Sequence, residues 1–120
     1  MKANKSVVSI TLSYKRGTIR VSMGILERLE LPKYIRLLVN ASKKQFGVEA
    51  TNKSDSSNIK IAYPKNKLSN GYVIHSQFLL EQIYQFMNWD INKNYRSYGE
   101  FNDGSKVAVM NLKKSKVVHR

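Results

Sequence analysis

Apolar and polar side chains alternate in the first part of the chain, in short segments that predict β-strands. Over residues 7–14 every second side chain is apolar, as in a strand with one buried face. A turn of two basic residues and a glycine follows, and residues 18–21 predict the return strand. Ser22 can cap a short helix with its hydroxyl, and Pro32 ends that helix. Two further strands are predicted after it, at residues 34–39 and 45–50.

The second half of the chain predicts the same order of elements. A polar segment at residues 51–57 separates the halves, and Ser76 can cap a second helix over residues 77–88. Two strands are predicted before that helix, at residues 58–63 and 71–75, and two after it, at residues 95–101 and 106–112. The last two form a hairpin around Asn102-Asp103-Gly104, a strong turn sequence. The basic segment 113–120 is expected to fray.

A short internal repeat accounts for this shared order. Residues 17–29 recur as residues 71–83 at a constant offset of 54 positions, which aligns Ile19 with Val73. Such a repeat is typical of a supersecondary unit whose apolar face is covered by a second copy. We therefore predict one mostly β domain in which two interlocked strand–strand–helix–strand–strand copies form a small barrel with a helix on each side. The copies span about residues 7–50 and 58–112.

The composition is that of a single globular domain. The 120 residues are 42% hydrophobic and 10% aromatic, which is enough for a core. The absence of cysteine excludes a disulfide framework, thiolate metal ligands and thiol catalysis. No apolar run approaches the roughly 18 residues of a membrane-spanning helix, and residues 1–16 lack the core of a signal peptide. We therefore expect a cytoplasmic protein with no membrane partner.

Net charge is the strongest indication of function. The chain has 21 lysines and arginines against 8 acidic residues, a net charge of +13 and a pI near 10.1. Such an imbalance attracts polyanions. We expect nucleic acid, or a protein that handles it, as the partner. An acidic protein partner stays open, and so does a role of the lysines in solubility alone.

The motif around the first helix resembles a known family. A strand and a glycine turn are followed by I-x-V-S-x-x-I-L-x-x-L-x-L-P-x-Y-I-x-L-L-V and a hairpin. This order resembles the swapped-hairpin AbrB/MazE domain over Lys15 to Ala50 and, more faintly, over Pro64 to Leu112. In that family two copies exchange hairpins as a dimer, so the resemblance implies an intramolecular, pseudo-symmetric swapped-hairpin barrel. The chain also looks like small proteins of phages and mobile elements of low-GC Gram-positive bacteria.

The resemblance implies DNA binding by basic residues on one face of the barrel, without a recognition helix. Lys15 and Arg16 match a basic pair that family members often carry, and Arg28 matches a basic helix position. Other family positions lack the expected residue: Ser22 stands where the family usually has proline, and Glu27, Ile74, Glu81 and Gln82 carry no positive charge. The similarity therefore favours the fold more strongly than the function.

Basic residues at predicted turns are the leading candidates for phosphate contacts. Arg20 is the most informative, because it alternates with Ile19 and Val21 and so faces the polar side of its strand. Ordinary solvated turns produce a similar pattern, and this alternative stays open. If the copies interlock, the first basic turn and the loop at 65–67 should lie close together. The candidate nucleic-acid-binding residues are Lys15, Arg16, Arg20, Arg28, Lys33, Arg36, Lys43, Lys44, Lys65 and Lys67.

Three tyrosines are candidates for contacts with bases or with a partner protein: Tyr72, Tyr95 and Tyr98. Half-buried strand positions are the alternative for each of them. The two histidines, His75 and His119, have no second ligand at metal-binding spacing. No phosphate-binding glycine loop or nucleophile motif is present. We therefore expect no metal, no cofactor and no enzymatic activity.

The leading hypothesis is a small AbrB-like transcriptional regulator that binds duplex DNA through a basic face. The alternative is a phage or mobile-element inhibitor of the anti-CRISPR type, which binds a host nuclease or ribonucleoprotein. A single-stranded nucleic-acid chaperone is a third hypothesis, based on charge and tyrosines. Either main role places the protein in the cytoplasm of a bacterial cell or a phage-infected host. Whether two chains form a homodimer stays open.

Overall fold

A computed structural model describes residues 8–52, 58–63, 71–101 and 106–119. Its fold is mostly β with two α-helices, as predicted. The first copy comprises β1 (Ser9–Ser13), β2 (Thr18–Val21), α1 (Met23–Arg28), β3 (Tyr34–Asn40) and β4 (Gln45–Thr51). The second comprises β5 (Ile59–Lys60), β6 (Tyr72–His75), α2 (Gln77–Met87), β7 (Asn94–Phe101) and β8 (Val107–Asn111). A 3₁₀ turn η1 (Leu112–Lys114) and a last strand β9 (Lys116–Val118) follow.

The two copies interlock through their strands. The sheet runs in the order β5-β3-β4-β8-β7-β1-β2-β6, with β9 also on β7, and the pairs are antiparallel. The first strand of each copy pairs with the third strand of the other, as β1 with β7 and β5 with β3. Corresponding strands also pair, as β2 with β6 and β4 with β8. Exchanging the copies reproduces these four pairings, in keeping with the predicted pseudo-symmetric swapped-hairpin arrangement. The exception is that β1 pairs with β2, whereas β5 and β6 do not pair in the described residues.

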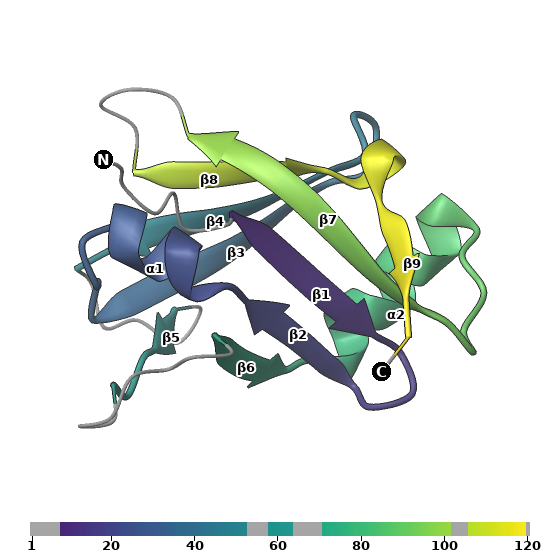
Figure 1. The fold of residues 1–120 in the computed structure, drawn as a ribbon, viewed down its shortest axis with the longest axis horizontal. Helices are drawn as coiled ribbons and strands as arrows, with labels where there is room; N and C mark the ends of the chain where they lie inside the picture. Colours follow the sequence, from purple (N-terminus) through teal and green to yellow (C-terminus); the bar gives the residue numbers. More distant parts are fainter. Residues whose placement is uncertain (1–7, 53–57, 64–70, 102–105, 120) are drawn as a thin grey trace.

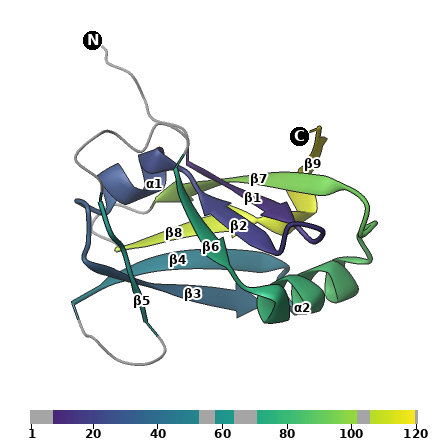
Figure 2. The same ribbon diagram turned by 90° about the horizontal axis from the view of Figure 1, so that it is seen from below.

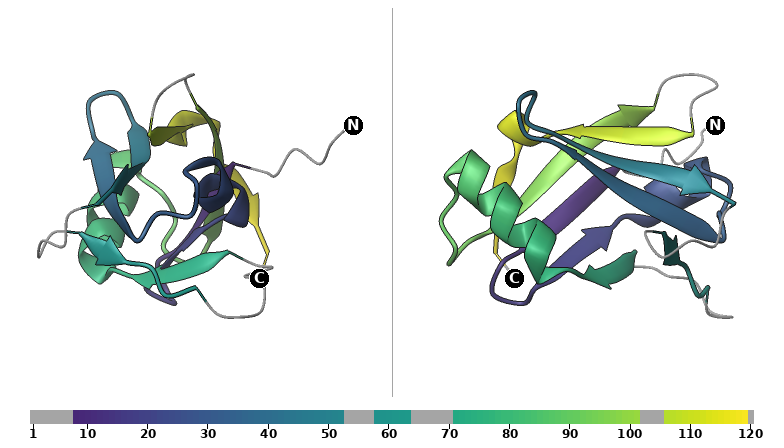
Figure 3. Two further views of the ribbon diagram at one scale, coloured as in Figure 1. Left: turned by 90° about the vertical axis from the view of Figure 1, so that its left-hand side faces the viewer. Right: turned by 180° about the vertical axis from the view of Figure 1, so that it is seen from behind.

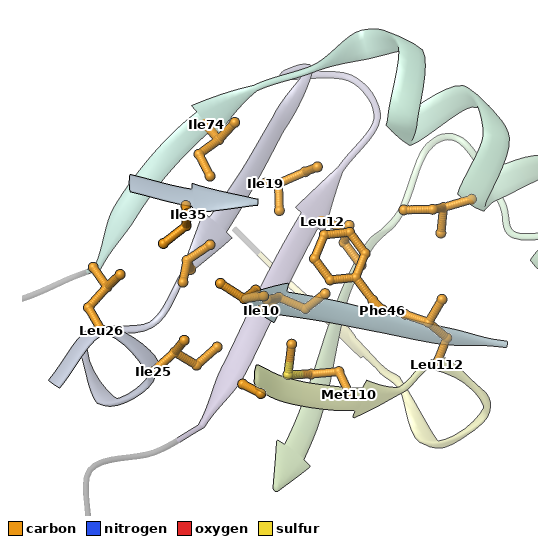
Figure 4. Packing of buried hydrophobic residues seen from close by; sticks show 14 of the residues in the cluster. Ile10, Leu12, Ile19, Ile25, Leu26, Ile35, Phe46, Ile74, Met110 and Leu112 are labelled. Atoms are coloured by element: carbon orange, nitrogen blue, oxygen red, sulfur yellow. The ribbon is translucent and has the colours of Figure 1, made fainter. Parts of the chain in front are cut away.

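The sheet curls round a single apolar core (Figure 3, left). In Figure 2 the strands β1, β2 and β7 form one layer and β3 and β4 the opposite one. The helices α1 and α2 lie at opposite ends of the molecule (Figure 1). Figure 4 shows residues of both copies, among them Leu12, Phe46 and Met110, packed together between the layers. Neither copy therefore has a core of its own.

Each helix begins at a capping serine, as the sequence predicts. The Ser22 hydroxyl accepts a hydrogen bond from the Ile25 N–H, and the Ser76 hydroxyl accepts one from the Leu79 N–H. These bonds satisfy N–H groups that have no partner within the helix. The second helix ends at Asn88, whose φ of 55° lies in the left-handed region.

The repeat alignment fails by one residue in the strand that precedes α2. A constant offset makes Ile19 equivalent to Val73, but Ile19 is buried whereas Val73 is not, and the buried side chain of that strand is Ile74, which lies opposite Ile19. Val73 pairs with Arg20 and is 37% exposed. A shift of one residue turns every side chain of a strand to the opposite face. The predicted equivalence of Ile19 and Val73 is therefore wrong, and burial of Ile74 determines the observed register.

Two further expectations differ from the structure. The segment 58–63 was expected to be a strand throughout, but β5 comprises only Ile59–Lys60. In the described residues β5 and β6 are the two edges of the sheet and do not pair with each other. The segment 113–120 was expected to fray, whereas residues 112–118 form η1 and β9. This end is held by pairing with β7 and by a hydrogen bond between the Ser97 and Ser115 hydroxyls.

Candidate nucleic-acid interface

Three basic side chains and a threonine form a row across the outer face of strands β2, β1, β7 and β9. Ile10 and Leu12 are buried, so Thr11 between them points outward. Arg20 is opposite Thr11 on one side, and Arg96 is opposite it on the other. Lys116 of β9 is in turn opposite Arg96. We call Arg20, Thr11, Arg96 and Lys116 the cationic row.

The cationic row is held in place by the sheet itself. Arg96 Nε donates a hydrogen bond to Thr11 Oγ1 at 3.1 Å, across 85 positions of sequence. Neighbouring strands lie about 4.8 Å apart, so the row from Arg20 to Lys116 spans about 14 Å. In Figure 1 the strands that carry it lie side by side in front of β3 and β4. Backbone pairing therefore sets the spacing of its three positive charges.

No acidic residue occupies the outward positions around the cationic row in the described part of the chain. On β6, β2, β1, β9 and the part of β7 that pairs with β1, these outward positions hold hydroxyl, amide, aromatic, imidazole and aliphatic side chains. They are Ser9, Ser13, Thr18, Val73, His75, Asn94, Tyr98 and Val118. The first outward carboxylate along β7 is Glu100, opposite Val109 of β8. The face thus has a positive charge that no described acidic neighbour on it neutralises.

Lys15 and Arg16 extend this face at the end of β1 and β2. Both are exposed in the turn between these strands. The turn is fixed by hydrogen bonds from the Gly17 N–H to the Tyr14 carbonyl at 3.1 Å and from the Arg16 N–H to Ser13 Oγ at 3.2 Å. Three of the predicted residues, Lys15, Arg16 and Arg20, are therefore brought together by one hairpin.

The other predicted cations in the described residues lie elsewhere. Arg28 of α1 lies over the Phe101 ring at 5.0 Å. Arg36 of β3 donates from Nε to Glu49 at 3.0 Å, so its charge is partly neutralised. Lys44 donates from Nζ to the Phe86 carbonyl at 3.2 Å, which ties the β3–β4 turn to α2.

Lys33 precedes β3 and Lys43 lies in the β3–β4 turn, both away from the cationic row. Lys65 and Lys67 lie outside the described residues, and so does their expected approach to the first basic turn. The structure thus divides the predicted cations into one group on the row and its hairpin, and a second group around β3 and α1.

The three candidate tyrosines have different surroundings. Tyr95 stacks on Trp89 with ring centroids 4.1 Å apart, and both rings contact Tyr84 edge-on. Tyr72 faces inward opposite Val21, beside a cleft of about 520 Å³ between β5 and β6. Tyr98 is 45% exposed and lies on the same outer face as the cationic row. Of these three, Tyr98 is therefore the one placed to contact a ligand of that face.

Tyr84 anchors α2 to the end of the barrel. Its hydroxyl lies 2.7 Å from the Lys93 carbonyl and 3.1 Å from the Leu12 carbonyl, and it accepts from the Tyr14 N–H at 3.3 Å. Burial raises the pKa of Tyr84 to about 12. A proton held so firmly keeps the hydroxyl as a donor, which suits a structural role.

Two cations of the row, Arg96 and Lys116, and the threonine between the arginines, Thr11, are absent from the sequence-based candidates. Arg96 lies between Tyr95, which faces inward, and Ser97, which is buried. If this segment is predicted to be a strand, alternation alone places Arg96 on the outer face. Lys116 carries no such local signal, because β9 depends on its pairing with β7. Its place in the row follows only from the three-dimensional pairing.

Neither a metal site nor a membrane span is found in the described residues. No group of three or more His, Cys, Asp or Glu side chains is close enough there to hold a metal ion. No described helix is long and apolar enough to cross a bilayer. Comparison with known proteins gives no match to a family model, a curated protein or a solved structure.

Proposed function

We propose that this protein binds duplex DNA through the cationic row and the adjoining β1–β2 turn, and that it acts as a small regulator. The observation that supports the proposal most directly is the row itself: three cations in register on one outer face, with no acidic residue at the described outward positions beside them. Arg20 and Arg96 are partly exposed and Lys116 is exposed, so the row can attract a polyanion, and most contacts would be to phosphate groups.

Each member of this surface has a role that follows from its chemistry. Arg20 and Arg96 present planar guanidinium groups, which can contact phosphate oxygens in pairs. Thr11 orients Arg96, and Lys116 adds a positive charge at the edge of the sheet. Lys15 and Arg16 project beyond the sheet, where a loop can follow a neighbouring stretch of backbone. The resulting binding depends on charge more than on base sequence.

The test is a titration with a DNA duplex of about 24 bp, which is long enough to cover the proposed binding face. Binding is measured by fluorescence anisotropy at two salt concentrations. If about six phosphates are contacted, raising salt from about 50 to 200 mM should weaken binding by about 10³-fold or more. Absent or salt-insensitive binding would overturn the proposal. That result would favour the alternative of a host protein as partner.

A matched pair of variants locates the interface. Arg20→Gln and Arg36→Gln each remove one positive charge, the first from the cationic row and the second from a pair with Glu49 on β4. We expect Arg20→Gln to weaken duplex binding and to lower the salt slope by about 0.9, the contribution of one phosphate contact. Arg36→Gln should retain the wild-type slope. Equal losses in both variants would mean that only the total charge matters.

A further inference from the structure

We propose that a hollow beside the cationic row holds one unpaired nucleobase, so that the preferred ligand is a nucleic acid with a bulged, terminal or single-stranded base. This inference rests on the proposed function and extends it from phosphate contacts to a base. The hollow has a volume of about 670 Å³ and lies where β7 leaves β1 and pairs with β8. Volumes of about 300–1,000 Å³ are usual for small-ligand sites.

Tyr98 provides an aromatic surface in this hollow. It lies two positions after Arg96 on the same strand and face, opposite the small residue Ser9. Its side chain is 45% exposed, whereas the ring of neighbouring Tyr95 is used in the stack with Trp89. A base has two flat faces and stacks on an exposed aromatic ring whatever its identity.

Polar side chains of β4, β8 and β7 line the hollow together with the tyrosine. Gln45 of β4 is opposite Asn111 of β8, and both line the hollow. Asn111 Oδ1 accepts from the Lys113 N–H at 3.0 Å, which orients this amide. Amide groups can donate to and accept from the edge of a base, and the Glu100 carboxylate can accept from an amino group such as that of cytosine.

Lys114 completes the chemistry that a nucleotide requires. It comes from η1, also lines the hollow, and can contact the phosphate attached to the bound base. Ring, amide, carboxylate and ammonium groups thus converge within one hollow next to the cationic row. A base stacked inside a duplex cannot reach Tyr98, so the occupant must be unpaired.

The experiment compares a fully paired duplex with the same duplex carrying one unpaired base. Affinities are measured by anisotropy at one salt concentration, and 2-aminopurine at the bulge reports stacking through its quenching. We expect the bulged duplex to bind about tenfold more tightly, and its fluorescence to fall on binding. Tyr98→Ala should remove both effects, so that the bulged and the paired duplex bind this variant with equal affinity.

Two control variants separate the hollow from general effects. Tyr98→Phe keeps the ring and should keep the preference. Phe78→Ala removes an aromatic side chain that is 70% exposed on α2, and should change neither affinity. Circular dichroism confirms that each variant is folded.

The outcomes distinguish this inference from the proposed function. Salt-dependent binding of both probes with equal affinity would overturn the base site and leave duplex binding intact. A preference that survives in Tyr98→Ala would place the unpaired base elsewhere and would also overturn the inference. Failure to bind either probe would overturn both proposals.

Discussion

The carbonyl oxygen of Gly17 accepts a 3.2 Å hydrogen bond from the backbone N–H of Ser76, the residue that caps α2. At the other end of the β2–β6 ladder, Gly71 lies against Ser22, the residue that caps α1. Both glycines have positive φ, 66° at Gly17 and 86° at Gly71. The glycine of each copy thus faces the capping serine of the other, so the repeated glycine–serine spacing joins the two copies.

This relationship predicts that Gly71→Ala is destabilising. A Cβ at Gly71 would lie 2.3 Å from the Val21 carbonyl oxygen, and its φ is one that residues with side chains rarely adopt. We expect a loss of about 2 kcal/mol or more in the free energy of unfolding, measured by urea titration. Gly47→Ala is the control, because a Cβ there meets its nearest neighbour at 3.5 Å. Equal stability of the two variants would contradict this prediction.

The Tyr84 hydroxyl predicts a dependence of stability on alkaline pH. Tyrosine in the unfolded chain ionises near pH 10, whereas burial raises the pKa of Tyr84 to about 12 in the folded protein. The unfolded state therefore loses its proton first, and the contribution of Tyr84 to stability should fall as pH rises from about 10 to 12.

Unfolding titrations of wild type and Tyr84→Phe between about pH 8 and 12 test this expectation, because this range includes the pKa of the unfolded and of the folded state. The variant should be less stable at neutral pH, because the Tyr14 N–H loses its acceptor, and should lack this part of the alkaline decline. Parallel curves for wild type and Tyr84→Phe would show that the hydroxyl does not contribute.

A change at Thr11 should lower the affinity for DNA without changing the number of positive charges that contact phosphate. Thr11→Val removes the acceptor that orients Arg96 but leaves the arginine in place. We expect a loss of about two- to fivefold in duplex affinity, with the salt slope unchanged. Arg96→Gln should lower that slope by about 0.9. Binding titrations at several salt concentrations distinguish the two, and a changed slope in Thr11→Val would contradict a purely orienting role.

Local sequence signals were sufficient for much of the fold. The strand at 18–21 and the caps Ser22 and Ser76 are found as predicted, since turns and caps depend on a few adjacent residues. The register of β6 was not predictable in the same way, because Tyr72 to His75 could place either set of side chains inward. Burial of Ile74 against Ile19 decides it.

The candidate site was predictable only in part. Arg20 and its hairpin follow from alternation within one strand pair, but Arg96 joins them only because β1 pairs with β7. That pairing links segments far apart in sequence, and β9, which brings Lys116, depends on it in turn. Arg36 has the same chemistry, but its charge is partly neutralised by Glu49, a neighbour that sequence alone does not identify.

The exchange of strands between covalently joined copies has a thermodynamic consequence. In a dimer that swaps hairpins, assembly is bimolecular and dilution favours the separated chains. Here β1 pairs with β7, and β5 pairs with β3, within one polypeptide. Formation of the barrel is therefore a first-order process, and its melting temperature should be the same at nanomolar and at millimolar protein.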